Sequence, residues 1–459
     1  MILALAAALA AAAPAPAAPA KAEVSVTRRG EGFEAEFVLP RAAPAWGFFR
    51  SSLAADDRQP WRPRSWTILT SGVRLERRGN YDALVGEGDG PVPRRVRIRI
   101  VPYTREVLSD YVPALRLGGD GIALFDGQFS LFSVASLAEL DRLGLDPQDG
   151  PIGDGGTRVR FRGRPSDLRL AGDNAGYAIG NSAGTYGLYG VPGAVDHGGM
   201  ATVVDPGMPA WLAADIRTFT PQLLDRYRKL LGSPGSLRPT VLASWAGAAQ
   251  PGASLNGGVL KGLVLMRVSG QAATRPSPPL RALAYRYIAH ESAHFWLGQL
   301  LDYEKVADNW IMEGGADLLA IRALGVNDPS YDMRAALQKS LTSCLAASRK
   351  GGLATASERQ DFQAKYDCGA VLSLLAERAA GGDYPVFVRR MIADNADDRS
   401  VSASEWLALL DTYPAGRGLA ARIRPLLAEA QPTPKGWTDL LRAAGIRFRL
   451  RPDQTPELM

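Results

Sequence analysis

The sequence predicts an α+β protein, in which a β-rich N-terminal domain is followed by a mainly helical domain. Residues 94–100 (RRVRIRI) and 157–162 (TRVRFR) alternate apolar and basic side chains, as half-buried strands do. In residues 211–232 apolar side chains instead recur at spacings of three and four, which is typical of an amphipathic helix. A chain of 459 residues, 46% of them hydrophobic, is long enough for two or three domains.

The chain is expected to divide into four segments. They are a signal peptide at 1–20, the β-rich domain at 22–205, the mainly helical domain at 206–400 and a C-terminal helical extension at 401–459. The glycine-rich stretch 172–193 interrupts any helix and marks the end of the first domain. Within the second, residues 238–245 and 257–270 are each predicted to form a strand. The polar end 451–459 is predicted to be disordered.

The N-terminal residues are typical of an export signal. An apolar run too short to span a bilayer is followed by small residues and prolines that offer A-x-A cleavage sites, although no Lys or Arg precedes the run. No later segment is long and apolar enough for a transmembrane helix. We therefore expect a soluble mature protein in the periplasm or secreted, and the sequence does not indicate its oligomeric state.

The net charge and the two cysteines indicate which partners and which covalent links to expect. The formal net charge of +6 is small for this length and no Lys/Arg run occurs, so nucleic acid is not an expected partner. The two cysteines, Cys344 and Cys368, are an even number in a chain that would enter an oxidising compartment, which predicts a disulfide between them. The alternative is a pair of buried thiols.

The stretch IAHESAHFWLGQ (288–299) contains two of the three histidines of the chain, four residues apart. On a helix they lie on a single stripe with apolar residues, namely Leu283, Tyr287, His290, His294, Leu297 and Leu301. Two imidazoles one turn apart can bind a single zinc ion. Glu291 lies off this stripe, where its carboxylate can hold a water molecule beside the metal. The alternative is two core histidines beside an unrelated glutamate.

A second predicted helix, 308–325, supplies a third ligand. Glu313 follows His294 after eighteen residues, enough for the first helix to end and for the chain to return. Two His and one Glu leave one zinc position open, as in catalytic sites. Asp317, one turn beyond Glu313, is a candidate hydrogen-bond acceptor for a ligand imidazole.

The HESAH motif, followed after eighteen residues by Glu in NWIMEGGA, resembles the gluzincin metallopeptidases, and most closely the aminopeptidase N family. The resemblance implies a thermolysin-like catalytic domain that binds one zinc ion per chain. It further implies that His290, His294 and Glu313 are the ligands, that Glu291 is the general base, and that the substrate is a peptide or protein.

Two further motifs of the family, an oxyanion-binding tyrosine and an amine-binding strand, match this sequence only in part. The family has a tyrosine in Y-x-K-G-A that stabilises an oxyanion, and KYDCGAV matches it with Tyr366, although Cys368 replaces the lysine. The family also has a G-x-M-E-N strand whose glutamate holds the free amine of the substrate. Residues 256–268 keep the glycines and strand character but have no carboxylate. The resemblance thus implies a zinc peptidase without implying aminopeptidase specificity.

Two other functions remain open. GNSAG (180–184) fits the G-x-S-x-G pattern of a serine hydrolase, with Ser182 as nucleophile, but its glycine-rich surroundings do not favour the helix which that pattern requires. Alternatively, the chain is a gluzincin-like protein that binds zinc or a partner without turning over peptides. The presence of Glu291 argues against this alternative, and the absence of the amine-binding carboxylate argues for it.

Overall fold

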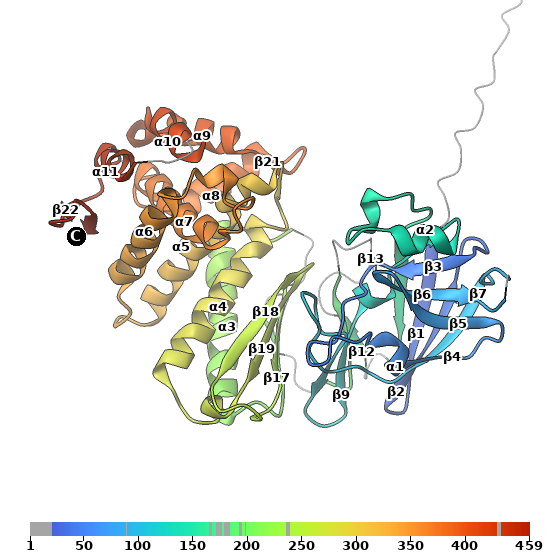
Figure 1. Cartoon of the computed structure of the whole chain (residues 1–459). Coiled ribbons are helices and arrows are strands. Elements are labelled where there is room, and N and C mark those ends of the chain that lie inside the picture. Colours follow the sequence, from blue (N-terminus) through green and yellow to red (C-terminus); the bar gives the residue numbers. More distant parts are fainter. Residues whose placement is uncertain are drawn as a thin grey trace, which may run out of the picture. The chain divides into compact units, whose positions relative to one another are not determined.

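The computed structural model is shown in Figure 1. It describes residues 21–88, 90–164, 168–170, 177–178, 184–191, 195–197, 199–235, 239–428 and 433–459. The predicted signal peptide at 1–20 lies outside these residues. The described residues form two compact units, the first within 21–110, 126–162 and 177–178, and the second within 111–125, 163–170 and 184–459.

The first unit contains two β-sheets. The strands of the larger sheet are β1 (Ala22–Arg29), β2 (Gly32–Val38), β4 (Trp66–Ile68), β7 (Arg95–Ile100), β11 (Thr157–Arg162) and β13 (Tyr177–Ala178), in the order β13-β11-β1-β2-β7-β4. Those of the smaller sheet are β3 (Ala45–Phe48), β5 (Val73–Arg78), β6 (Tyr81–Gly86) and β10 (Leu131–Val134), in the order β10-β3-β6-β5. Two short helices accompany them, α1 (Arg62–Ser65) and α2 (Leu137–Arg142).

The period of two predicted from the sequence is confirmed in β7 and β11. Exposed and buried side chains alternate along β7. Its outward arginines form ion pairs with β2, Arg95 to Glu36 at 3.0 Å and Arg97 to Glu34 at 2.6 Å. These arginines therefore form a solvated sheet face, as predicted.

The second unit begins with two further sheets. An antiparallel sheet consists of β8 (Ala114–Leu117), β9 (Gly121–Phe125), β12 (Leu168–Leu170) and β14 (Tyr186–Tyr189). A mixed sheet consists of β15 (Val195–His197), β16 (Met200–Val204), β17 (Thr240–Trp245), β19 (Leu263–Ser269) and β18 (Ser254–Leu260), in that spatial order, with β18 at the edge. Side chains of the two sheets, such as Leu115 and Leu265, share one hydrophobic cluster. Because of this packing, residues 111–125 and 183–205 of the predicted N-terminal domain lie in the second unit.

The strand structure predicted at 257–270 is confirmed, but this range contains parts of two strands, β18 and β19. The chain reverses at Lys261 and Gly262, so that β18 and β19 pair antiparallel with Leu260 opposite Leu263. Gly262 has a φ of +65°, a conformation that glycine adopts without strain. The glycine between two apolar runs was thus the turn signal in this stretch.

Helices form the rest of the second unit. They are α3 (Ala210–Leu231), α4 (Pro278–Leu297), α5 (Trp310–Asn327), α6 (Met333–Ser348), α7 (Gln363–Ala379), α8 (Tyr384–Asp394), α9 (Ala403–Thr412), α10 (Leu419–Ala428) and α11 (Pro434–Ala443). Two short strand pairs are β20 (Asp302–Tyr303) with β21 (Ser400–Val401), and β22 (Phe448–Leu450) with β23 (Pro456–Leu458). Within the described residues, none of the helices has the length and apolar character needed to cross a membrane.

One hydrophobic core runs through the helical part of this unit, from Met200 to Leu458. The predicted C-terminal extension shares this core with the preceding helices. The prediction that 451–459 is disordered is wrong, because β23 pairs with β22 and the Leu458 backbone N–H donates to Gln338 Oε1 of α6 at 2.7 Å.

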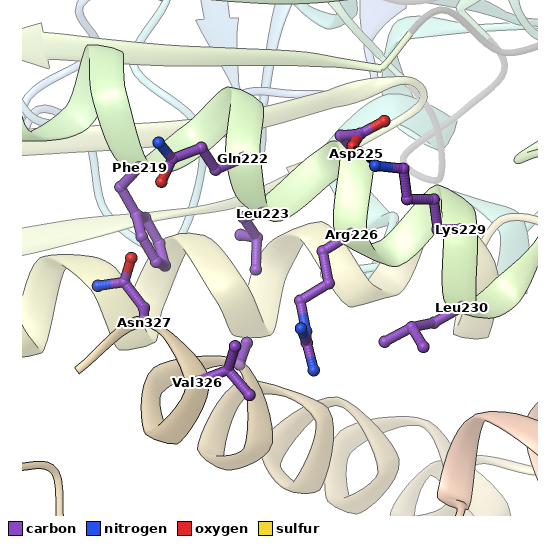
Figure 2. A pocket seen from close by; sticks show the side chains of 10 residues that line it. Phe219, Gln222, Leu223, Asp225, Arg226, Lys229, Leu230, Val326 and Asn327 are labelled. Atoms are coloured by element: carbon purple, nitrogen blue, oxygen red, sulfur yellow. Dashed lines mark ion pairs between the residues drawn. The ribbon is translucent and has the colours of Figure 1, made fainter. Parts of the chain in front are cut away.

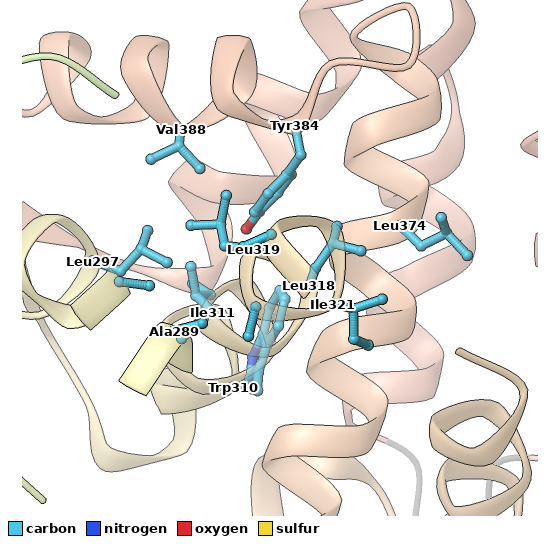
Figure 3. Packing of buried hydrophobic residues seen from close by; sticks show 14 of the residues in the cluster. Ala289, Leu297, Trp310, Ile311, Leu318, Leu319, Ile321, Leu374, Tyr384 and Val388 are labelled. Carbon is cyan, nitrogen blue, oxygen red and sulfur yellow. The ribbon is translucent and has the colours of Figure 1, made fainter. Parts of the chain in front are cut away.

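Helix α5 lies at the centre of the helical core. Figure 3 shows apolar side chains of α4, α7 and α8, including Leu297, Leu374 and Val388, around those of α5. Helices α5 and α7 approach so closely that their backbones touch at Gly314 and Gly369. A Cβ atom on either glycine would overlap the backbone of the other helix. Glycine at these two positions is therefore a condition of the packing.

We predict that Gly314→Ala lowers the free energy of unfolding by about 1–3 kcal/mol, because the added methyl group must push α7 away from α5. Gly325→Ala in the same helix is the matched control, since its methyl group would meet only the flexible Met333 side chain. Chemical denaturation of both variants checks this. Equal stability of Gly314→Ala and the wild type would contradict the packing described.

Candidate metal centre

Helix α4 brings His290 and His294 together as the sequence predicts. The helix begins with Pro278 after the N-cap residue Ser277, whose hydroxyl accepts the Leu280 N–H at 3.4 Å. Both histidines are buried, and their Nε2 atoms are 3.2 Å apart. The predicted interior stripe is wrong at Leu283, which is 52% exposed, because the first turns of α4 face the core with Leu280 and Ala284 instead.

Glu313 in the first turn of α5 completes a triangle of donor atoms. Its Oε2 lies 3.2 Å from His290 Nε2 and 3.5 Å from His294 Nε2. Tetrahedral zinc, with ligand bonds of about 2.0–2.2 Å, requires donor atoms about 3.3–3.6 Å apart. The residues therefore fit a zinc ion both in donor type and in spacing.

Asp317 orients the first of these imidazoles. Its Oδ1 lies 3.0 Å from His290 Nδ1, and its Oδ2 accepts a hydrogen bond from Arg286 at 3.1 Å. An Nδ1–H donated to this carboxylate leaves the lone pair of His290 Nε2 directed at the triangle. Burial lowers the pKa of His290, but Asp317 and Glu313 raise it more, so its pKa is above the ordinary value. The carboxylates of Asp317 and Glu313 thus favour a positive charge next to His290.

Glu291 lies beside the triangle with its carboxylate free. Within the described chain no hydrogen bond or ion pair engages its oxygens. Burial raises the pKa of Glu291, while the positive charges that His290 and His294 can carry lower it. A carboxylate without a protein partner, next to two imidazoles, is available to bind a water molecule.

Tyr366 approaches the cluster from α7. Its ring stacks on the imidazole of His290, with centroids 5.6 Å apart and planes inclined by 30°. Burial raises the pKa of Tyr366, and the carboxylates of Glu313 and Glu291 raise it further. The hydroxyl therefore keeps its proton near neutral pH and can donate it in a hydrogen bond.

The predicted disulfide between Cys344 and Cys368 is present, and it links α6 to α7. Cys368 occupies the position of the lysine in the family motif, two residues after Tyr366.

The edge strand β18 lies next to α4. Tyr287 of α4 donates its hydroxyl to the Leu265 carbonyl at 2.8 Å, and Gly257 of β18 leaves the space for this contact. A Cβ on Gly257 would lie 2.6 Å from the Tyr287 hydroxyl oxygen. No acidic side chain occurs in the β18 sequence SLNGGVL.

The sequence motifs did not indicate two residues near the site, Arg286 and Lys365. Arg286 precedes His290 by four residues, so the two side chains lie on the same face of the helix. This spacing could have identified Arg286 as a neighbour of the site. Lys365, beside Tyr366, is 7% exposed, and its ammonium group has no hydrogen-bond or ion-pair partner among the described residues. Burial lowers the pKa of Lys365. An isolated lysine in a helix carries no sequence signal of burial.

Other candidate features lie apart from these residues. A cavity of about 570 Å³ between α3 and the end of α5 is lined by residues such as Leu223, Arg226 and Val326 (Figure 2). None of its lining residues belongs to the donor triangle. Ser182 lies outside the described residues.

Comparison with known proteins identifies the fold. No family model matches the sequence, and no curated protein matches it. Among solved structures, the chain is similar to an aminopeptidase N family protein from Idiomarina loihiensis, with a TM-score of 0.59 and 10% identity over 94% of this chain and 79% of that one. At this identity the similarity establishes the fold alone.

Two further similar structures superpose less well. They are an M1 zinc metallopeptidase from Deinococcus radiodurans (TM-score 0.45, 15% identity, 90% of this chain and 94% of that one) and yeast LTA4 hydrolase (TM-score 0.46, 13% identity, 90% and 68%). These superpositions are too loose to support an argument. The Idiomarina structure confirms the predicted resemblance in fold and the α+β class.

We predict that Asp317→Asn weakens zinc binding about 10- to 100-fold, because an amide holds the His290 tautomer less firmly than a carboxylate does. Asp397→Asn, at an exposed aspartate outside the site, is the matched control. Competition with a fluorescent chelator measures both affinities. Unchanged affinity in Asp317→Asn would show that the contact with His290 does not support the metal.

Proposed function

We propose that this protein, which has the fold of an aminopeptidase N family protein, is an exported zinc-dependent peptidase. The observation that carries the proposal is the triangle of His290 Nε2, His294 Nε2 and Glu313 Oε2, with edges of 3.2, 3.2 and 3.5 Å. The free carboxylate of Glu291 and the ring of Tyr366 beside this triangle supply the two further groups that hydrolysis requires.

His290, His294 and Glu313 would hold one zinc ion per chain. When bound, zinc supplies a Lewis acid that activates water and polarises the substrate carbonyl. Asp317 keeps His290 in the tautomer that presents Nε2 to the ion.

Glu291 is the general base. Its carboxylate accepts a proton from the attacking water and then passes that proton to the leaving amine. Burial, which raises its pKa, makes this carboxylate a stronger base than an exposed glutamate. Tyr366 donates its hydroxyl proton in a hydrogen bond to the oxyanion that develops on the substrate.

The edge strand β18 is a place where an extended peptide can add as a further strand. We do not assign aminopeptidase specificity, because β18 has no carboxylate to pair with an α-ammonium group. The proposed substrate is therefore a peptide or protein that binds through its backbone. Export to the periplasm or the exterior belongs to the proposal, and the disulfide supports it because disulfides persist in oxidising compartments.

We predict that His290→Ala loses zinc and hydrolysis together, whereas Glu291→Gln keeps zinc and loses about 10²–10⁴-fold in kcat, the contribution of a general base. Glu304→Gln, at an exposed glutamate outside the site, is the matched control. Metal analysis and cleavage of a fluorogenic peptide library measure both properties. Loss of zinc in Glu291→Gln would refute the assigned role. Bound zinc without any Glu291-dependent cleavage would favour a binding protein.

A further inference from the structure

The disulfide lies at the point where α7 brings Tyr366 into the site. Cys368 comes two residues after Tyr366 and is bonded to Cys344 of α6, with their Cα atoms 4.7 Å apart. Both cysteines are buried. The covalent link therefore joins the beginning of α7 to a neighbouring helix less than one turn from the tyrosine.

The first turn of α7 packs Ala364 in the core but lacks the interactions that usually cap a helix N-terminus. Its N-cap residue, Phe362, makes no side-chain capping bond and is 58% exposed, and no acidic side chain occurs in the turn. Lys365 adds a positive charge near the positive end of the helix dipole. Hydrogen bonds from Ala364 N–H to the Asp361 carbonyl (3.1 Å) and from Lys365 N–H to the Phe362 carbonyl (3.3 Å) are of the tighter 3₁₀ type. Such a helix end is prone to fraying.

The helix is fixed on two sides immediately after this turn. Cys368 is bonded to α6, and the next residue, Gly369, touches the backbone of α5 at Gly314. If the bond to α6 is removed, α7 keeps its contact with α5 but loses its covalent anchor to α6. Asp367 remains as a polar contact with α6 through Ser340, so the helix would loosen without detaching.

We infer that the Cys344–Cys368 disulfide positions Tyr366: it holds the first turn of α7 so that the tyrosine stays stacked on His290. An effect of the disulfide on catalysis rests on the proposed function. Its effect on the order of the first turn of α7 does not depend on that function. The two cysteines do not touch the reacting atoms and act through Tyr366. The metal ligands lie on α4 and α5, so the chain without this bond keeps its zinc.

The competing explanation is general stabilisation, since any disulfide restricts the unfolded chain. In that case removal lowers the stability of the whole unit and leaves the geometry of the folded site unchanged. The two explanations differ in what happens to Tyr366 in the folded protein.

The test compares the zinc-loaded full chain with its C344A/C368A variant. We expect kcat to fall about tenfold, since a small displacement of a catalytic group is costly, while KM changes less than about twofold. Zinc content stays at that of the wild type. In a Tyr366→Phe background, which itself should cost about 10²–10³ in kcat, the cysteine substitutions have no further effect. An equal fall in kcat in both backgrounds, or no fall in either, would overturn the inference.

Hydrogen exchange gives a readout that does not require activity. Amides of residues 363–367 should exchange about tenfold faster in C344A/C368A, while those of α4 and α5 keep their protection. Leu441→Ala in α11, a core substitution away from the site, is the control for general destabilisation. Uniformly faster exchange, as expected for Leu441→Ala, would overturn the inference. If the wild type hydrolyses no peptide, the proposed function fails, and this exchange comparison still decides the role of the disulfide.

Wild-type protein refolded with a reductant provides a second route if C344A/C368A does not fold. The reductant supplies two electrons and two protons, so the disulfide becomes two thiols while both side chains remain. Faster exchange confined to 363–367 in this sample supports the inference. Failure of the reduced chain to fold would show that the bond is needed by the whole unit, and this outcome also overturns it.

Discussion

The backbone contact between Gly314 and Gly369 is the constraint on which the site depends. Glu313 precedes Gly314 on α5, and Tyr366 precedes Gly369 on α7 by three residues. Neither helix contains His290, so the glutamate and the tyrosine reach the same imidazole only if α5 and α7 pack at the distance that two glycines allow. Any side chain at this contact would separate the two helices and increase the distance between these groups.

The buried charges of the site are held in a connected arrangement. Asp317 accepts from both His290 and Arg286, so its charge is compensated on two sides within the protein. Buried charges are tolerated when they are paired in this way. Glu291 differs from Asp317 and Glu313, because its carboxylate has no protein partner among the described residues. It is therefore the carboxylate of the site that can bind a water molecule.

Helices and strands could be predicted where interactions between residues close in sequence determine them. The alternation along β7 and the helical period around His290 follow from backbone geometry and were correct. Predictions failed where distant contacts decide. Leu283 continues the apolar stripe of α4 but is exposed, because the core contacts this part of the helix at Leu280 and Ala284. Residues 111–125 precede the predicted domain boundary yet pack on the sheet of the second unit, because their apolar side chains complete its core.

The sequence by itself determined the chemical groups of the site and their order along the chain. Spacing of four on one helix brings His290 and His294 to the same face whatever surrounds them, since the helix repeat is a local property. Only the tertiary structure decided that Glu313 Oε2 lies 3.2 Å from His290 Nε2 and that Tyr366 stacks on the same ring. The distance between α5 and α7 is set by the contact of Gly314 with Gly369, and the disulfide joins α7 to α6. Such contacts between residues far apart in the chain have no signature in local spacing.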